Sequence, residues 1–288
     1  MNSLEISFIG SACGKNRFEP KDKIMLLLLC RQYKGMYKQL FFDKGIFTLL
    51  DPSKRTYDEQ LKRIYTDYKK EVSSPEEFAK IQIDIKKRLK QENEDIKEED
   101  LNHATSFLEN SMKKDCGTNN EKGVIKKMNY KKGNNRMYYY SENNWTIRGF
   151  HDATCYEGHV IEIKTRMKQQ NVRKNEYDLY QLFGYLLAMN KTSGKIVQKY
   201  ADNVYDSEIE TDREYGIIDL SVESWRNRFE KFKSELNNFF EETNKYSEEM
   251  FDPYNVIDPK ENPIALFDID GVPHNINPKY EKIVNALT

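Results

Sequence analysis

The stretch from Arg148 to Arg166 constrains the fold of this chain more than any other segment. Within it, residues 160–165 alternate apolar and charged side chains and are rich in β-branched residues, which predicts a β-strand. Successive side chains of a strand point to opposite faces, so Glu162 and Lys164 should project from the same face. The sequence therefore predicts a strand that presents an acid and a base side by side.

A turn signal at Glu157-Gly158 separates this strand from an earlier one over residues 145–150. Two strands joined across such a turn form a hairpin. We expect this hairpin to bring Asp152 beside Glu162. Two carboxylates and the Lys164 ammonium would then share one pocket.

Carboxylates held this close repel each other, and a hard divalent cation is the usual way to keep both ionised. Mg²⁺ binds one or two protein carboxylates together with phosphate oxygens of a substrate. A neighbouring lysine can orient a water or stabilise a developing negative charge. This combination is typical of metal-assisted phosphodiester hydrolysis. The alternative is a surface hairpin with ordinary charges on its polar face, since charged residues make up 32% of the chain.

The composition favours a globular α/β enzyme. The 288 residues are 38% hydrophobic and 12% aromatic, which is enough to bury a full core in one large domain or two small ones. The longest apolar stretch, 24–30, is too short to span a bilayer, and the N-terminus lacks the pattern of a signal peptide. The four cysteines include no C-x-x-C pair. We therefore expect an intracellular protein, neither secreted nor membrane-bound, with reduced thiols and no zinc or iron–sulfur site.

Charge is unevenly distributed along the chain, although the net charge is only −1. Residues 101–175 contain fourteen Lys or Arg against seven Asp or Glu, so this segment carries +7 and the remainder −8. Basic residues around an acidic site would attract a polyanion, because phosphate contacts supply most of the non-specific affinity for nucleic acid. A solvated lysine-rich surface explains the same excess equally well.

The N-terminus predicts a short strand over 4–9 that leads into a tight turn of small residues over 10–14. The backbone N–H groups of such a turn and the Ser11 hydroxyl could hold a phosphate, to which Lys15 and Arg17 would add positive charge. Taken alone, this pattern is a weak signal.

Helical patterns dominate the next hundred residues. A helix over 21–40 has a mostly apolar face that predicts core packing. The stretch 55–110 is mostly helical, and Pro75 stands where a new helix would start after Ser73-Ser74. The charge-dense part, 86–100, predicts an exposed helix or a hairpin of helices.

Glu121 has two interpretations that do not exclude each other. Gly117 and Thr118 can start a helix, and Glu121 stands three residues after Thr118, which is the spacing of a capping box. Glu121 also lies about thirty residues before Asp152 and would supply a third carboxylate to the metal site.

Residues 175–190 predict a strong helix, on which Gln181 and Tyr185 are four residues apart and so share one face. A glutamine there could reach the attacking water or a backbone phosphate. Tyr185 alone fits a core position at least as well. The remaining patterns predict two strands and a long helix, over 195–200, 213–220 and 222–242.

Four short motifs, in this order and at these separations, resemble the PD-(D/E)XK nuclease superfamily: Gly117-x-x-x-Glu121, Gly149-x-x-Asp152, Glu162-Ile163-Lys164 and Gln181-x-x-x-Tyr185. The branch of the phage lambda exonuclease and the YqaJ-like viral recombinases is the most similar, because it also begins with a small-residue Ser turn and has a G-x-x-x-E helix upstream. The resemblance implies an α/β fold with a restriction-endonuclease-like core, in which helices flank a central mixed β-sheet. That domain would span 1–245, including a helical N-terminal part.

The resemblance also implies roles by position. Asp152, Glu162 and the Ile163 carbonyl would bind Mg²⁺ or Mn²⁺, with Glu121 assisting from its helix. Lys164 would position or activate the water. Gln181 and Tyr185 would help to position the substrate.

Substrate binding is implied for Ser11, which matches the residue that contacts the terminal phosphate in that branch. Further candidates are Lys15, Arg17 and Arg166. Two departures from the family pattern stand out: His151 replaces the proline that often precedes the first aspartate, and no arginine precedes the Ser11 turn. The second departure weakens the expectation of 5′-phosphate recognition.

The function that follows from the resemblance is a metal-dependent DNA exonuclease serving recombination or repair, in a virus or phage. Duplex DNA is the expected substrate, and the expected protein partners are a single-strand annealing protein and further copies of the chain. The alternatives are an endonuclease of the same fold acting on DNA or RNA, and a non-catalytic nucleic-acid-binding module.

The C-terminal residues 246–288 predict an extended tail, because five prolines forbid long regular elements there. Within it, residues 265–272 resemble the D-x-D-G opening of haloacid dehalogenase-like phosphatases. Only seventeen residues follow Gly271, too few for that fold, so we interpret the match as coincidence.

Overall fold

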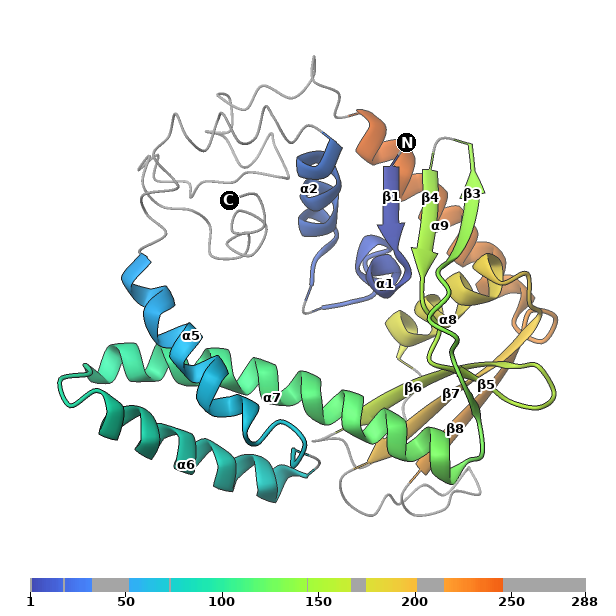
Figure 1. The fold of residues 1–288 in the computed structure, drawn as a ribbon. Helices are drawn as coiled ribbons and strands as arrows, with labels where there is room; N and C mark the ends of the chain where they lie inside the picture. The colour runs from blue at the N-terminus through green and yellow to red at the C-terminus, as the bar shows by residue number, and fades with distance from the viewer. Residues whose placement is uncertain are drawn as a thin grey trace.

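The computed structural model describes residues 2–17, 19–32, 52–72, 74–143, 145–166, 175–200 and 215–245. They form a mixed α/β architecture, in which helices flank two separate mixed β-sheets (Figure 1). This agrees with the predicted α/β class. No helix among these residues is long and apolar enough to cross a bilayer. The predicted tail and its D-x-D-G match lie outside the described residues.

The first sheet has three strands in the order β1-β4-β3. Strand β1 (Asn2–Glu5) runs parallel to β4 (Trp145–Gly149), and β3 (Tyr138–Glu142) pairs antiparallel with β4. This sheet therefore joins the N-terminus to the middle of the chain.

The second sheet has five strands in the order β2-β5-β6-β7-β8. Strand β6 (Val160–Arg166) pairs antiparallel with the two-residue β5 (Ala153–Thr154) and parallel with β7 (Ser193–Tyr200). Helix α8 (Glu176–Ala188) makes the crossover that a parallel pair requires. The edge strands, both antiparallel to their neighbours, are β2 (Lys131–Lys132) and β8 (Tyr215–Ser221).

The predicted hairpin between 145–150 and 160–165 is wrong in its first strand. Strand β4 belongs to the first sheet, and the partner of β6 across the Glu157-Gly158 turn is β5. The chain leaves the first sheet at Gly149, where an added Cβ would lie 3.1 Å from atoms of Ile6 and Tyr185. Asp152 therefore lies where the chain enters the second sheet.

The N-terminal turn is also wrong as predicted. After β1 the chain forms a short 3₁₀ helix (Ile6–Phe8) and one turn of α-helix, α1 (Ile9–Ala12), before α2 (Lys21–Gln32). Gly10 packs against helix α8, and a Cβ on it would lie 2.6 Å from Cβ of Tyr177. The small residues 10–12 therefore lie in a helical turn that packs closely against α8, not in a loop. The predicted helix beyond residue 32 lies outside the described residues.

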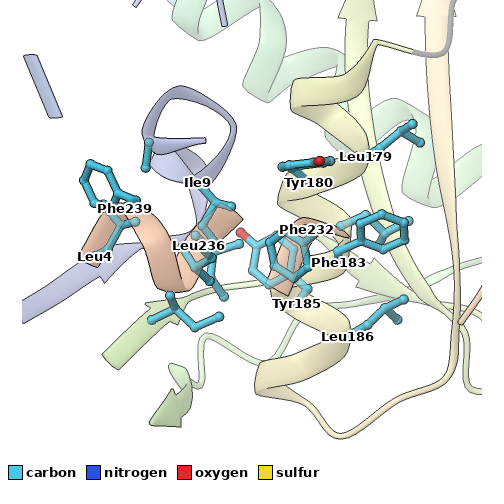
Figure 2. Close-up of a cluster of buried hydrophobic side chains, with 14 of the residues drawn as sticks. Leu4, Ile9, Leu179, Tyr180, Phe183, Tyr185, Leu186, Phe232, Leu236 and Phe239 are labelled. Carbon is cyan, nitrogen blue, oxygen red and sulfur yellow. The ribbon is translucent and has the colours of Figure 1, made fainter. Parts of the chain in front are cut away.

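The main core lies between the first sheet, α8 and α9 (Arg226–Lys245). Figure 2 shows side chains of α8 and α9 interleaved with Leu4 and Ile9 from the N-terminus. The Phe183 and Phe229 rings meet edge to face with 5.3 Å between their centroids, an arrangement that aromatic pairs favour. Helix α8 is thus fixed against both the N-terminal elements and the second sheet.

Three helices form a unit with a hydrophobic cluster of its own: α5 (Pro52–Thr66), α6 (Pro75–Glu92) and α7 (Glu98–Lys127). Helix α6 begins at Pro75, as the sequence predicted, and a capping box between Ser74 and Glu77 closes its start. Helices α6 and α7 form the expected hairpin. Gly117-Thr118 does not start a helix, because both residues lie inside the 30-residue α7. That helix runs from the helical unit to the second sheet (Figure 1).

Candidate functional site

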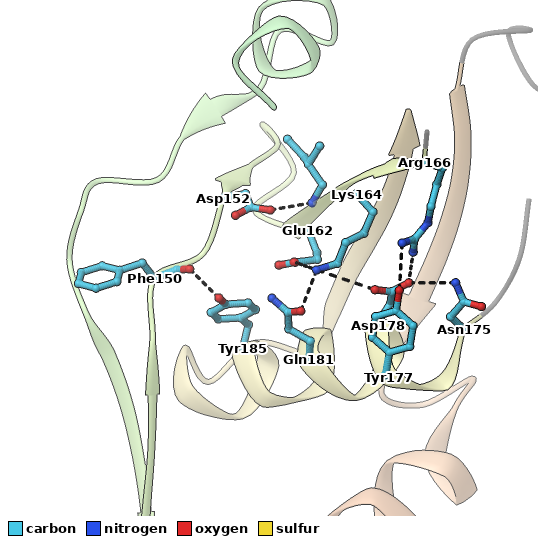
Figure 3. Close-up of polar contacts among 11 residues, drawn as sticks. Phe150, Asp152, Glu162, Lys164, Arg166, Asn175, Tyr177, Asp178, Gln181 and Tyr185 are labelled. Carbon is cyan, nitrogen blue, oxygen red and sulfur yellow. Dashed lines mark hydrogen bonds and ion pairs between the residues drawn. The ribbon is translucent and has the colours of Figure 1, made fainter. Parts of the chain in front are cut away.

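Strand β6 presents Glu162 and Lys164 to the same side, as the sequence pattern predicted. The Lys164 Nζ lies 2.7 Å from Oε1 of Glu162, which is only 2% exposed (Figure 3). The intervening Ile163 points to the opposite face and joins a hydrophobic cluster with Val124 of α7. The strand therefore places a buried ion pair on one face and core packing on the other.

Asp152 lies beside these residues, although the strand that pairs with β6 is not the one predicted. Its Oδ2 accepts a hydrogen bond of 2.7 Å from the backbone N–H of Ile163. This bond crosses from the segment before β5 to β6, so it fixes the carboxylate next to Glu162. The expected proximity of Asp152 and Glu162 thus holds.

One pocket of about 850 Å³ gathers most of the predicted site residues. Its walls come from three elements, α7, β6 and α8, and from the segment that carries Asp152. The predicted residues among its lining are Glu121, Asp152, Glu162, Ile163, Lys164, Arg166 and Gln181. Lys113 and Lys114, which the motif analysis did not single out, line the same pocket from α7.

Helix α8 carries two of the predicted site residues, Gln181 and Tyr185, which make different contacts. The Gln181 Oε1 accepts a hydrogen bond of 2.8 Å from Lys164 Nζ (Figure 3). The Tyr185 hydroxyl is buried and donates a hydrogen bond of 2.6 Å to the carbonyl of Phe150. Tyr185 therefore anchors the backbone two residues before Asp152, whereas Gln181 contacts the site directly.

Asp178 is a site residue that the sequence reasoning missed. Its side chain is fully buried, its Oδ1 lies 3.8 Å from Lys164 Nζ, and its other oxygen pairs with Arg166. Arg166 also donates a hydrogen bond of 3.1 Å to the Tyr177 hydroxyl. The available signal was an aspartate three residues before Gln181, on the same helix face. Arg166, predicted to bind substrate, is held by this pairing at the edge of the pocket.

The pKa values of three carboxyl groups in the pocket, those of Glu121, Asp152 and Glu162, are all raised. Burial, together with the neighbouring Asp152 charge, raises the pKa of Glu162 to about 8. Burial also raises the pKa of Asp152 to about 6, with Glu121 adding to the shift and the Ile163 N–H opposing it. The Glu121 pKa is raised by burial and by Glu162. Burial lowers the Lys164 pKa, but the charges of Glu162 and Asp178 outweigh it, so the net shift is upward.

The donor set fits a hard divalent cation. The Oε2 of Glu162 is buried with no hydrogen-bond partner among the described residues, and an unpaired buried polar atom is costly. Hydrogen bonds hold one oxygen each of Asp152 and Glu162, leaving the second oxygen available. The oxygens of these two and Glu121 do not form a group of three within 4.8 Å of one another.

The predicted phosphate-binding residues near the N-terminus are not part of the pocket lining. Ser11 is 1% exposed, accepts a hydrogen bond from Asn16 and donates one to Glu19. Lys15 pairs with Glu235 at 2.9 Å. A carboxylate next to a buried hydroxyl would repel a phosphate, so the position of Ser11 gives no support to terminal-phosphate binding. Among Ser11, Lys15 and Arg17, Arg17 is exposed to solvent.

Comparisons with known proteins add little to this geometry. No family model and no curated protein match the chain. A solved structure described as "Crystal structure of SSO0001" is similar over 53% of this chain and 70% of its own, with 16% sequence identity and a TM-score of 0.29. A similarity at this level carries no conclusion about fold or function.

Proposed function

We propose that this protein is a divalent-metal-dependent deoxyribonuclease with a restriction-endonuclease-like core, formed by the second sheet and helix α8. The observation that carries the proposal is the convergence of Asp152, Glu162 and Lys164 in one pocket, with Gln181 bonded to the lysine. These are the residues of the motifs that resemble the PD-(D/E)XK superfamily, and they come from three separate elements.

Asp152, Glu162, the Ile163 carbonyl and Glu121 would hold the Mg²⁺ or Mn²⁺. The bound metal would lower the pKa of a water and stabilise negative charge on the scissile phosphate. The raised pKa values of Asp152 and Glu162 support this assignment, because a cation would stabilise the ionised carboxylates that burial disfavours.

Lys164 would orient the attacking water or stabilise negative charge. Burial lowers its pKa, but the charges of Glu162 and Asp178 outweigh this in the metal-free protein, so the ammonium acts as a hydrogen-bond donor there. Gln181 and Asp178 also contact the Lys164 Nζ and help to fix the side chain. A donor held in this way can position the attacking water or stabilise charge that develops on the phosphate.

DNA is the proposed substrate, and the basic segment supports it. Lys113 and Lys114 are exposed on α7 and line the pocket beside Glu121, where backbone phosphates would approach the carboxylates. An exonuclease serving recombination or repair, with an annealing protein as partner, remains the leading hypothesis. The buried Ser11 removes the main argument for end recognition, which favours an endonuclease of the same fold as the second candidate.

The test uses purified protein with Mg²⁺ or Mn²⁺ and four substrates: linear duplex, closed circular duplex, single-stranded DNA and RNA. We expect Asp152→Asn and Glu162→Gln each to lower cleavage at least ~10²-fold, since each removes a metal-binding charge. The matched control is Glu230→Gln, an exposed position on α9 that should cleave normally.

The possible outcomes separate the hypotheses. Wild-type cleavage rates in both pocket variants would contradict the site. DNA binding without cleavage in either metal would favour the binding module. Cutting of the closed circle would exclude strict end dependence and favour the endonuclease.

A further inference from the structure

We propose a second metal site, of the zinc class, on the turn between β5 and β6, where Cys155, Glu157 and His159 supply one ligand atom each. These three atoms all lie within 4.8 Å of one another, and this is the group of three candidate ligands that the described residues bring this close. The nuclease hypothesis plays no part in this inference.

The backbone of the turn preorganises the three side chains. The Cys155 N–H donates to the His159 carbonyl at 3.2 Å, and the Gly158 N–H donates to the Cys155 carbonyl at 3.0 Å. Gly158 has a φ of +80°, a conformation that glycine adopts without strain. The turn is therefore closed by its own hydrogen bonds, and the ligand atoms of residues 155, 157 and 159 lie close together on it.

The chemistry of the ligands selects the metal. A thiolate, an imidazole and a carboxylate are the ligands that Zn²⁺ takes in proteins, usually in a tetrahedral arrangement. Three protein ligands leave one position for a water or another group. Mg²⁺ prefers oxygen ligands and disfavours a thiolate. The turn and the carboxylate pocket should therefore select different ions.

The contacts around Cys155 fit this role. The thiol is 9% exposed and hydrogen-bonds the Glu157 carboxylate, a contact that lowers the pKa of that carboxyl. A zinc ion would take the place of the thiol proton, which would pass to solvent. Two cations lie near the turn. The Lys195 Nζ pairs with Asp219 at 3.3 Å, so its charge is partly neutralised, and the Lys191 Nζ would lie 3.9 Å from a Cβ on Gly158.

The position of the turn gives the site a structural purpose. The turn joins β5 to β6, so its two ends lead directly to Asp152 and to Glu162. Strand β5 has only two residues and offers few ladder hydrogen bonds to hold the pair together. A metal clip across the turn would stiffen the hairpin that carries both carboxylates.

The test is a Co²⁺ titration of the reduced, metal-free full-length protein. We expect one equivalent of Co²⁺ to produce a thiolate-to-cobalt charge-transfer band in the near ultraviolet, together with the visible bands of tetrahedral cobalt. Excess Zn²⁺ should remove the bands, and excess Mg²⁺ should not. Absence of the charge-transfer band in the wild-type protein would overturn the proposal.

Single-residue variants test which side chains bind the metal. Cys155→Ser and His159→Ala should each abolish the bands and weaken Zn²⁺ binding at least ~10²-fold by calorimetry, with the fold checked by circular dichroism. His159 is partly exposed, so its variant remains informative if Cys155→Ser fails to fold. Cys13→Ser is the matched thiol control, and Glu162→Gln removes the carboxylate pocket instead. Both should keep the bands, and retention of the bands in His159→Ala would refute the assignment.

Discussion

Replacing Glu162 by glutamine should make the metal-free protein more stable at neutral and alkaline pH. Glu162 is buried, and its pKa is raised from 4.5 in the unfolded chain to about 8 in the fold. Between these values the unfolded chain ionises and the folded protein does not, so stability is full below pH 4.5 and falls as the pH rises toward 8. Glutamine has no proton to lose and retains an oxygen for Lys164.

The magnitude follows from the width of this window. One pKa unit corresponds to about 1.4 kcal/mol, so the wild-type protein should lose about 3 kcal/mol relative to the variant between pH 5 and pH 8. For a protein of this size, that free energy corresponds to a difference in melting temperature of roughly 6–12 °C. At pH 5 the two proteins should differ little from this cause.

The assay is thermal or urea unfolding of both proteins in EDTA at several pH values from 5 to 8. Glu230→Gln, an exposed change on α9, controls for the loss of one negative charge. Mg²⁺ should then raise the stability of the wild-type protein and have less effect on Glu162→Gln, since the variant lacks one ligand. A wild-type-to-variant difference that stays constant with pH, or that favours the wild type at pH 8, would refute the reasoning.

Two further predictions concern the surroundings of the site. Asp178→Asn should lower the free energy of unfolding by about 3–5 kcal/mol, because it removes the buried negative charge that pairs with Arg166 and Lys164. An unchanged urea-unfolding curve would contradict this. The double variant of Lys113 and Lys114 to alanine should weaken DNA binding in Ca²⁺. It should also reduce the slope of log affinity against log salt by about 2, since each phosphate contact contributes about 0.9; an unchanged slope would exclude both lysines from the DNA path.

The features that the sequence predicted correctly are set by the periodicity of side chains within a single strand or helix. The side-chain period of a strand places Glu162 and Lys164 on one face wherever the strand pairs, and the ion pair between them follows. The helix over 175–190 was recognisable for the same reason, and it carries Gln181 to Lys164.

The errors concern contacts between distant segments. Nothing local to residues 145–150 indicates that they pair with β1, so the wrong strand was placed in the hairpin. The small residues near Ser11 suggested a turn, whereas Gly10 is needed for contact with Tyr177, which is 167 positions later. Asp178 was overlooked because its partners come from β6.

The strain among the carboxylates is itself an argument for a cation. A fold selected for stability alone would not bury Glu162 beside Asp152 and Glu121, because each raises the energy of the others when ionised. Lys164 neutralises at most one of these charges, and its own position depends on Asp178. A divalent ion would bring two positive charges to the unpartnered Oε2 of Glu162 and to the free oxygen of Asp152. In the proposed site, the stability lost by the metal-free protein and the affinity for a cation would have the same origin, so variants that remove one should remove the other.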